Sequence, residues 1–298
     1  MDLPLNQILE GNSLKILKTL PEQSVNSVVT SPPYYGLRDY GSEEQFGIEN
    51  TVEEYTQNLV KLFREVRRVL KDDGTVWVNL GDSYSRKNGD KNLIGIPWKV
   101  AFALQDDGWI LRQDIIWNKP NPMPESVKDR CTKNHEYIFL LTKNPKYYFD
   151  YKSIKEEAVY TDNREGKGRF TYNGKRSKDN NGGNGQNAFV KIDGTRNKRT
   201  VWTITTKPYK GAHFATFPED LIEPCVLAGT PENGVVLDPF MGSGTTAVVA
   251  RKLKRDYIGI ELNSDYIEIA EQRLQPVEQQ HQKEVHTEQI VNKFFGDE

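Results

Sequence analysis

The sequence predicts an α/β protein with a doubly wound, mostly parallel sheet, and three observations support this fold class. Short apolar segments alternate with stretches of helical periodicity through the N-terminal half. The segment VVLDPFMGSGTT has the pattern of a strand, a glycine-rich turn and the start of a helix. The next apolar segment, DYIGIEL, carries an acidic residue, Glu261, about 20 residues beyond that turn.

The first half of the chain yields most of the expected elements. The segment SLKILKTL places Leu14, Leu17 and Leu20 on one helical face, and VNSVV has the composition of a buried strand. A longer amphipathic helix is expected over residues 52–70, followed by a strand over TVWVNL. A further helix over 94–106 and strands over WILRQDIIW and EYIFLLT complete this half.

The pattern changes between about residues 152 and 204, where apolar periodicity is lost. Basic residues outnumber acidic ones by about six in this segment, and the tract NNGGNGQN adds a flexible polar run. Aromatic residues are interleaved with the charges, which suits phosphate neutralisation and base stacking on a nucleic acid, although a solvated linker is the alternative. The DNA-binding candidates are Arg164, Lys167, Arg169, Lys175, Arg176, Arg196, Lys198 and Arg199.

The α/β rhythm then returns. The segment SDYIEIAEQRL is expected to form a helix with Ser264 as its N-cap and Glu268 behind it. Residues 1–150 and 205–275 are therefore expected to form one domain that carries the segment 152–204 as an insertion. Residues 276–298, rich in Gln, Glu and Lys, are expected to form an exposed helix or a tail.

Composition excludes several classes of protein. The formal net charge of −2 gives no general affinity for nucleic acid, so such a partner must bind a local patch. Two distant cysteines, Cys131 and Cys225, and four histidines without the i, i+4 spacing indicate no metal site. No signal peptide and no apolar run of membrane-spanning length is found, so a cytoplasmic location is expected.

The glycine turn has three nucleotide-site interpretations. A phosphate-binding P-loop requires Lys after the second glycine, where Thr245 and Thr246 stand. A dinucleotide site requires a third glycine. What remains is a nucleoside-type ligand beside Asp238, with Glu261 accepting hydrogen bonds from the ribose hydroxyls; a tight structural turn is the alternative.

A second motif, TSPPYYG, follows the strand VNSVV. Each proline disfavours helical geometry in the residue before it, so Ser31 and Pro32 are expected to be extended. Their carbonyl groups then stay available to a ligand, and Tyr34 offers an aromatic ring beside them.

Together these residues resemble the β-type DNA amino-methyltransferases that use S-adenosylmethionine, in which the target-base motif precedes the cofactor motif. The family's catalytic motif, [DNS]-P-P-[YFW], matches Ser31, Pro32, Pro33 and Tyr34. Its cofactor motif, D-P-F-x-G-S-G-T, is matched in full, and KGAHFATFPEDLIEPCVLAGT resembles the segment that contacts the methionine end of the cofactor. The cofactor residues that the resemblance implies are Asn12, Phe214, Pro218, Asp238, Pro239, Phe240, Gly242, Gly244, Thr245 and Glu261.

The resemblance also implies a Rossmann-like methyltransferase fold with a mixed seven-stranded sheet, in which the basic insertion recognises the target. The segment NHEYIFLLTK is similar to a late strand motif of the family. One departure is visible: the family commonly has Gly-Asp near the N-terminus, close to the cofactor adenine, where this chain has Gly11 and Asn12.

The implied reaction is direct transfer of a methyl group to an exocyclic amine of a base flipped out of duplex DNA. The Ser31 hydroxyl and the Pro32 carbonyl accept from the amine, while Tyr34 stacks on the base. Ser at the first motif position favours cytosine N4, with adenine N6 as the alternative. Cytosine C5 chemistry needs an attacking thiolate, and Cys225 is interpreted as a packing residue instead.

Rival functions and partners complete the expectations. A DNA-binding protein without transfer activity and an α/β oxidoreductase are the rivals; the intact motifs count against the first and the missing third glycine against the second. The expected partner is double-stranded DNA. A restriction endonuclease acting on the same site is a candidate partner, in a restriction–modification system or a phage, and the chain is expected to be a monomer or a weak dimer.

Overall fold

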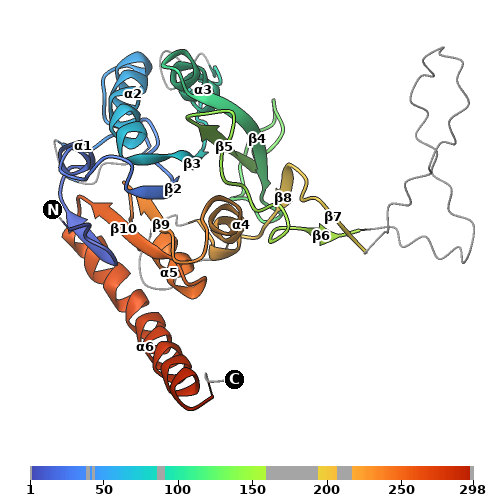
Figure 1. Ribbon diagram of the computed structural model, residues 1–298. Helices are drawn as coiled ribbons and strands as arrows, with labels where there is room; N and C mark the ends of the chain where they lie inside the picture. The colour runs from blue at the N-terminus through green and yellow to red at the C-terminus, as the bar shows by residue number, and fades with distance from the viewer. Residues whose placement is uncertain are drawn as a thin grey trace, which may run out of the picture.

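An eight-stranded sheet forms the centre of the computed structural model, which describes residues 2–37, 41, 44–85, 91–158, 194–206 and 217–295, with side chains to residue 283 (Figure 1). The strands lie in the order β1 (Gln7–Glu10), β10 (Asp256–Glu261), β9 (Val235–Asp238), β2 (Val25–Thr30), β3 (Leu70–Leu80), β5 (His135–Thr142), β4 (Ile110–Asn118) and β8 (Val201–Thr203).

Neighbouring strands are parallel except where β5 pairs with β3 and with β4. The predicted mostly parallel sheet is therefore confirmed, but it has one strand more than the seven expected. Two observed strands have no counterpart among the segments that the sequence indicated: β1 at one edge of the sheet and, pairing with Ile116–Asn118 of β4 at the other edge, β8. Its three residues are too few to show a periodic pattern, although Trp202 is buried against the sheet.

Helices cover both faces of the sheet, which makes the fold doubly wound. Helices α1 (Ser13–Leu17), α2 (Val52–Val69) and α3 (Ile96–Asp106) pack on one face. Helices α4 (Glu219–Gly229), α5 (Thr245–Lys252) and the first turns of α6 (Ser264–Phe295) pack on the other. Each face has its own buried apolar cluster, so the sheet separates two hydrophobic cores.

The longest of the first three helices, α2, illustrates how the sequence defines an element. The Thr51 side chain caps its N-terminus by accepting from the Glu54 N–H at 3.1 Å, and the next residues include two glutamates that suit the helix dipole. Its buried positions recur at helical spacing, and they are Tyr55, Thr56, Leu59, Val60, Leu62, Phe63, Val66 and Val69.

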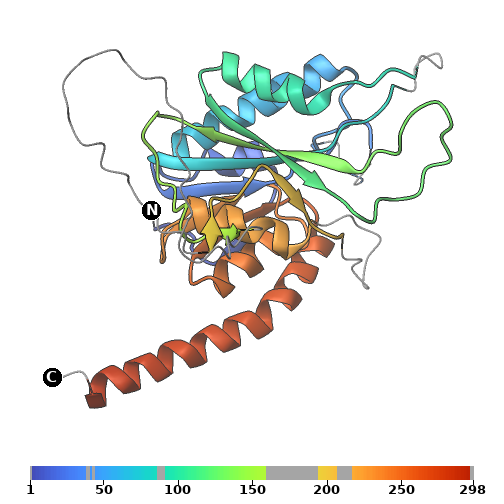
Figure 2. The ribbon, with the colours of Figure 1, turned by 90° about the vertical axis from the view of Figure 1, so that its right-hand side faces the viewer.

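The last helix differs from expectation at its start. Asn263 rather than Ser264 is the capping residue, because the Asn263 Oδ1 accepts from the Asp265 N–H at 2.8 Å. Both residue types cap helices well, and sequence alone did not separate two such neighbours. Beyond Pro276, α6 continues as one helix that projects from the body (Figure 2), so the helix rather than the tail is observed for residues 276–295.

The insertion joins the body through a short two-stranded sheet. Strands β6 (Glu156–Glu157) and β7 (Thr195–Arg196) pair antiparallel, and β8 follows within the range 152–204. The last residues of that range thus belong to the main sheet. Among the described residues, none of the helices combines the length and apolar character needed to cross a membrane.

Candidate active site

The two sequence motifs meet at the centre of the sheet. Strands β2 and β9 are parallel neighbours, with Ser27 opposite Val236 and Val28 opposite Leu237. After β2 the chain leads to α2 on one face, whereas after β9 it leads to α5 on the other. In open α/β sheets, ligands bind beyond the carboxyl ends of the strands, at the point where neighbouring connections leave for opposite faces.

Asp238 lies beneath the glycine turn and is fully buried. Its Oδ1 accepts from the Thr30 hydroxyl at 2.7 Å and from the Phe240 N–H at 3.0 Å, while its Oδ2 accepts from the Thr246 hydroxyl at 2.7 Å. Burial raises the pKa of this carboxyl to about 6, although the two hydroxyls and the N–H oppose that shift. Asp238 therefore shapes the turn from within.

The two glycines of the turn have different tasks. Both have left-handed backbones, with φ of 53° at Gly242 and 82° at Gly244. A Cβ at Gly244 would lie 2.7 Å from the Cβ of Ala270 on α6, so this glycine permits close packing. A Cβ at Gly242 would meet only the Phe240 carbonyl oxygen, at 4.0 Å, so bare backbone is open there to a ligand.

Glu261 braces the same turn from the end of β10. Its Oε2 accepts from the Gly242 N–H at 2.7 Å, and its Oε1 accepts from the N–H groups of Leu262 and Asn263 at 2.9 and 3.0 Å. Burial raises the pKa of Glu261 above its ordinary value, and the three N–H groups oppose that shift. A carboxylate has about four acceptor positions, so one remains for a ligand hydroxyl.

Several of the other cofactor candidates adjoin this turn, namely those on α1, on the turn itself and at the start of α5. The Asn12 Oδ1 caps α1 by accepting from the Lys15 N–H at 3.1 Å. The Pro239 carbonyl accepts from the Ser13 hydroxyl at 2.6 Å, and the Phe240 ring packs edge-on against Phe46 at 5.3 Å. Thr245 is the first residue of α5 and Pro218 directly precedes α4, while Phe214 lies outside the described residues.

These groups fit a nucleoside-type cofactor. The open backbone at Gly242 lets a ligand approach closely, the Phe240 ring supplies an apolar neighbour, and Glu261 keeps an acceptor position. No group of three or more His, Cys, Asp or Glu side chains that could hold a metal ion occurs within the described part of the chain.

The Ser31–Tyr34 loop follows β2 and belongs to neither a helix nor a strand, and the extended backbone expected of Ser31 and Pro32 stays a prediction. The Pro33 carbonyl accepts from the Tyr55 hydroxyl at 2.9 Å, which ties the loop to α2. Over the residues that the structure describes, no hydrogen bond reaches the Pro32 carbonyl oxygen. The Ser31 hydroxyl donates to the Asn79 Oδ1 at 3.3 Å, so the lone pairs of the Ser31 oxygen remain available to accept.

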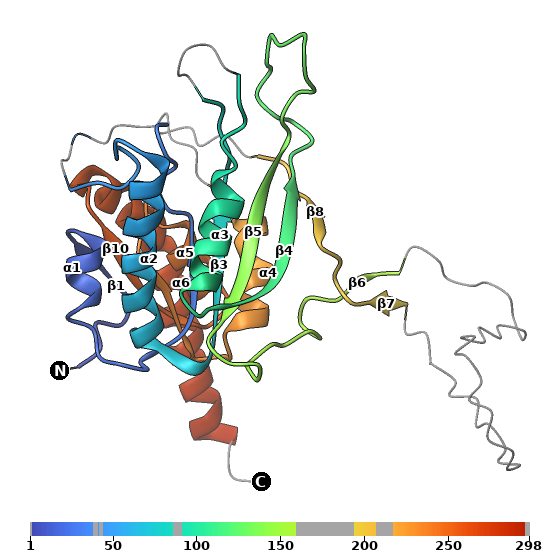
Figure 3. The ribbon, with the colours of Figure 1, turned by 90° about the horizontal axis from the view of Figure 1, so that it is seen from above.

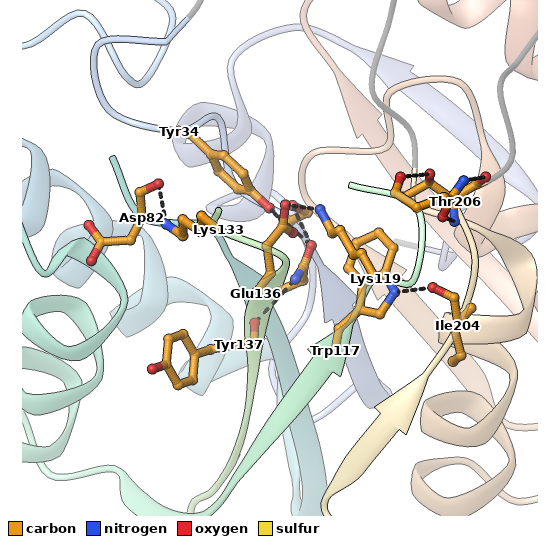
Figure 4. A network of polar contacts seen from close by, with 12 residues as sticks. Tyr34, Asp82, Trp117, Lys119, Lys133, Glu136, Tyr137, Ile204 and Thr206 are labelled. Atoms are coloured by element: carbon orange, nitrogen blue, oxygen red, sulfur yellow. Dashed lines mark hydrogen bonds and ion pairs between the residues drawn. The ribbon is translucent and has the colours of Figure 1, made fainter. Parts of the chain in front are cut away.

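Tyr34 is the centre of a polar network that joins three strand ends (Figure 4). Its hydroxyl lies 2.7 Å from the Glu136 Oε2 and 3.1 Å from the Asn79 Oδ1, and Lys119 forms an ion pair with the other Glu136 oxygen. The Asn79 amide donates to the Tyr137 carbonyl at 3.1 Å, which fixes its orientation. Burial, reinforced by the Glu136 charge, raises the pKa of Tyr34 well above its ordinary value, so the phenol keeps its proton.

Gly81 makes room for the Tyr34 ring. A Cβ at this position would lie 2.5 Å from the nearest ring carbon, so no larger residue fits without moving the tyrosine. The network residues Asn79, Lys119 and Glu136 were missed by sequence reasoning. The signal available was the NHEYIFLLTK segment, but only the antiparallel pairing of β3 with β5 shows that its glutamate lies beside Tyr34.

The remaining candidates divide between described and undescribed residues. Arg196 and Arg199 both form ion pairs with Glu156, at 2.8 and 2.6 Å, and the Lys198 ammonium lies 5.0 Å from the centre of the Trp202 ring. Arg164, Lys167, Arg169, Lys175 and Arg176 lie outside the described residues. Cys225 is fully buried in α4 and its thiol pKa is raised by burial, in accord with a packing residue.

A doubly wound sheet with a nucleoside-type turn beside an S-P-P-Y loop defines the class of methyltransferases that act on nucleic-acid amines. A family model described as DNA methylase matches residues 25–272, and the chain belongs to this family of N6 and N4 DNA methylases. The family uses S-adenosylmethionine, in agreement with the cofactor expected from the motifs.

Individual relatives agree with the family assignment. The chain is 47% identical to the type II methyltransferase M.Cfr9I of Citrobacter freundii, covering 90% of this chain and 87% of that protein. It is 46% identical to M.SmaI of Serratia marcescens, covering 90% of each.

Solved structures show the same fold. The PvuII DNA methyltransferase, described as cytosine-N4-specific, superposes with a TM-score of 0.67 at 21% identity, covering 93% of this chain and 91% of that one. A modification methylase of Thermus thermophilus, TTHA0409, solved with S-adenosyl-L-methionine, gives a TM-score of 0.60 at 25% identity, covering 91% of this chain and 95% of that one.

Proposed function

We propose that this DNA methylase transfers the methyl group of S-adenosylmethionine to N4 of cytosine in duplex DNA. The Ser31 hydroxyl donates to Asn79 and so offers its lone pairs to an incoming exocyclic amine, whereas the base assignment follows from the resemblance, in which Ser at the first motif position favours cytosine N4. Likeness to the PvuII enzyme concerns the fold, so the choice of cytosine N4 over adenine N6 depends on Ser31 itself.

The reaction requires the amine and the methyl group to be positioned more than it requires the enzyme to activate either of them. An exocyclic amine is a weak nucleophile because its lone pair is delocalised into the ring. S-adenosylmethionine supplies a methyl group already activated by its sulfonium. The Ser31 oxygen and the Pro32 carbonyl accept from the two amine N–H bonds, which lets the nitrogen become pyramidal and direct its lone pair at the methyl carbon. The N–C bond forms as the S–C bond breaks, the thioether leaves, and the methylated amine then loses one N–H proton to water. Alignment of this kind is worth up to roughly 7–11 kcal/mol in well-oriented systems.

Tyr34 supplies the surface on which the flipped base stacks. Its hydroxyl is held by Glu136, which is in turn held by Lys119, so the ring has one fixed orientation before DNA arrives. A ring fixed in advance loses little rotational freedom when the base stacks on it. Glu136 and Lys119 are thus positioning residues that act through Tyr34.

The partner is double-stranded DNA, and the basic segment around residues 164–199 is proposed to contact it. Relatives named type II methyltransferases support a place in a restriction–modification system, where an endonuclease acts on the same site. Since Arg196 and Arg199 are already paired with Glu156, contacts to phosphate by these two residues must compete with that carboxylate.

The test is to incubate the protein with duplex genomic DNA and radiolabelled S-adenosylmethionine, digest the DNA to nucleosides and identify the labelled base by mass. Label in N4-methylcytosine is the expected result. Label in N6-methyladenine would preserve the enzyme class and overturn the base assignment. No label on genomic DNA of several base compositions, together with retained DNA binding, would favour a binding protein without transfer activity.

A further inference from the structure

The connection between β4 and β5, residues 119–134, projects beyond the carboxyl ends of the strands (Figure 3). It starts and finishes at the site, because Lys119 at its beginning forms the ion pair with Glu136 just after its end. Any duplex whose flipped base reaches Tyr34 therefore approaches this loop.

The loop is stiff. Prolines at 120, 122 and 124 alternate with the other residues of the segment KPNPMP, and each fixes its own φ and restrains the residue before it. Farther along, the Arg130 guanidinium forms two hydrogen bonds with the Glu125 carboxylate, at 2.7 and 3.1 Å, and the Lys133 N–H donates to that carboxylate at 3.0 Å.

The loop is also anchored on both sides. Toward the β3–α3 connection, Asp129 pairs with Lys91, and the Arg130 guanidinium carbon lies 4.1 Å from the centre of the Tyr84 ring. Toward the segment after β8, the Asn121 amide donates to the Thr206 carbonyl at 3.1 Å and its oxygen accepts from the Thr206 N–H at 3.0 Å. Such anchoring holds the loop rigid at the rim of the site.

One apolar side chain stands out from this rigid loop. Met123, between Pro122 and Pro124, is 85% exposed, against 58% for Val201 and 51% for Leu37 and Phe102, which are the next most exposed large apolar side chains in the described ranges. Burying a methionine side chain is favourable, so a fixed backbone that presents one to water leaves that free energy to be gained on binding.

We propose that Met123 is a wedge that enters the base stack of the DNA at the place vacated by the flipped base. The role rests on the proposed function. Flipping costs a few kcal/mol because stacking and pairing are lost, and an apolar side chain in the gap recovers part of that cost. Proline-imposed stiffness reduces the entropy lost on insertion, which explains why the methionine is bracketed by prolines.

The experiment compares Met123→Ala and Met123→Leu on two duplexes. Both duplexes carry the site found by mapping the labelled base; in one the target base is paired, and in the other it faces an abasic position. We expect Met123→Ala to lower kcat/KM at least tenfold on the paired duplex and less than about threefold on the other, where little pairing energy must be lost. Met123→Leu keeps an apolar wedge and is expected to stay close to wild type on both.

Leu93→Ala provides the matched control, since Leu93 is also an exposed apolar residue, on the neighbouring loop that carries Lys91. Equal losses on the two duplexes with Met123→Ala, or no loss on the paired one, would overturn the wedge alone. Absence of transfer by the wild-type protein to either duplex would overturn the proposed function and the wedge with it. Binding of S-adenosylmethionine, measured by calorimetry, is expected to be unchanged in every variant.

Discussion

The turn after β9 and the loop after β2 lie side by side, and they differ in the groups that they offer to a ligand. The turn after β9 presents backbone: Asp238 and Glu261 each accept from an N–H of the turn, at Phe240 and at Gly242, and Gly242 leaves open main chain. The loop after β2 presents side chains, with Ser31 and Tyr34 held by residues from β3 and β5. Substitutions should therefore disturb the first loop through folding and the second through turnover.

The largest effect is expected on the backbone side, from Gly244→Ala. The new methyl group would collide with Ala270 of α6, including its main-chain Cα at 3.1 Å, and the left-handed φ adds strain. We expect a loss of about 3 kcal/mol or more in the free energy of unfolding, measured by urea denaturation.

Gly242→Ala is the matched control on the same turn. It has a left-handed φ but open space around the added methyl, so we expect a stability loss of only about 1 kcal/mol. Its affinity for S-adenosylmethionine should nevertheless fall at least tenfold, because the methyl occupies the ligand's approach. Equal stability losses for the two variants would contradict the distinction between a packing glycine and a ligand-facing one.

The next effect concerns pH and also lies on the backbone side. With a pKa of about 6 in the folded protein, Asp238 keeps a proton that the unfolded chain releases near pH 4. Its contribution to the free energy of unfolding therefore decreases as pH rises from about 4 to about 6, by about 2–3 kcal/mol.

Asp238→Asn should remove this component of the pH dependence. The asparagine Oδ1 keeps the Phe240 N–H, and its amide can donate to the Thr246 hydroxyl, which then turns toward the Val29 carbonyl at 3.5 Å. The measurement is urea denaturation of both proteins at intervals from pH 4 to pH 7. Parallel curves for wild type and variant would show that Asp238 is ionised throughout.

The smallest effect on stability, and the sharpest on turnover, is expected from Ser31→Ala. The hydroxyl is half-buried and makes one long hydrogen bond, so its removal should change the free energy of unfolding by less than about 1 kcal/mol. In the proposed mechanism it accepts from the amine in the transition state, so kcat should fall about 10- to 100-fold with S-adenosylmethionine affinity unchanged. A large loss of S-adenosylmethionine affinity would contradict the assignment of Ser31 to the target amine and would indicate a contact with the cofactor instead.

The sequence predicted the features that are contiguous in the chain better than those that are assembled across the sheet. Contiguous features were found: the strand before Ser31, the strand before the glycine turn and the acid at the end of β10 all lie where the pattern placed them. Features assembled across the sheet were not. Asn79, Lys119 and Glu136 lie on or beside three different strands, and their meeting depends on β5 running antiparallel between β3 and β4. Hydrophobic periodicity indicates that a segment forms a strand, but it does not indicate which strand lies beside it in the sheet.

Sequence reasoning also failed where a strand was very short and where two neighbouring residues were equally good helix caps. Strand β8 has three residues and follows a segment without apolar periodicity, so it was absorbed into the expected insertion. The helix cap fell on Asn263 instead of Ser264, a choice between two good capping residues that only the loop from β10 decides. The contacts of Glu261 with Leu262 and Asn263 fix that loop.

The pairing of Ser27 with Val236 in the middle of the sheet has a consequence for synthesis on the ribosome. At roughly 5–20 residues per second, strand β2 emerges some 10–40 seconds before its partner β9. Throughout that interval one edge of β2 lacks its neighbour, and β1 likewise waits for β10. A nascent chain that stops before β9 therefore contains the S-P-P-Y loop but not the glycine turn, so by the proposed function such prematurely terminated products are expected to be inactive in DNA methylation.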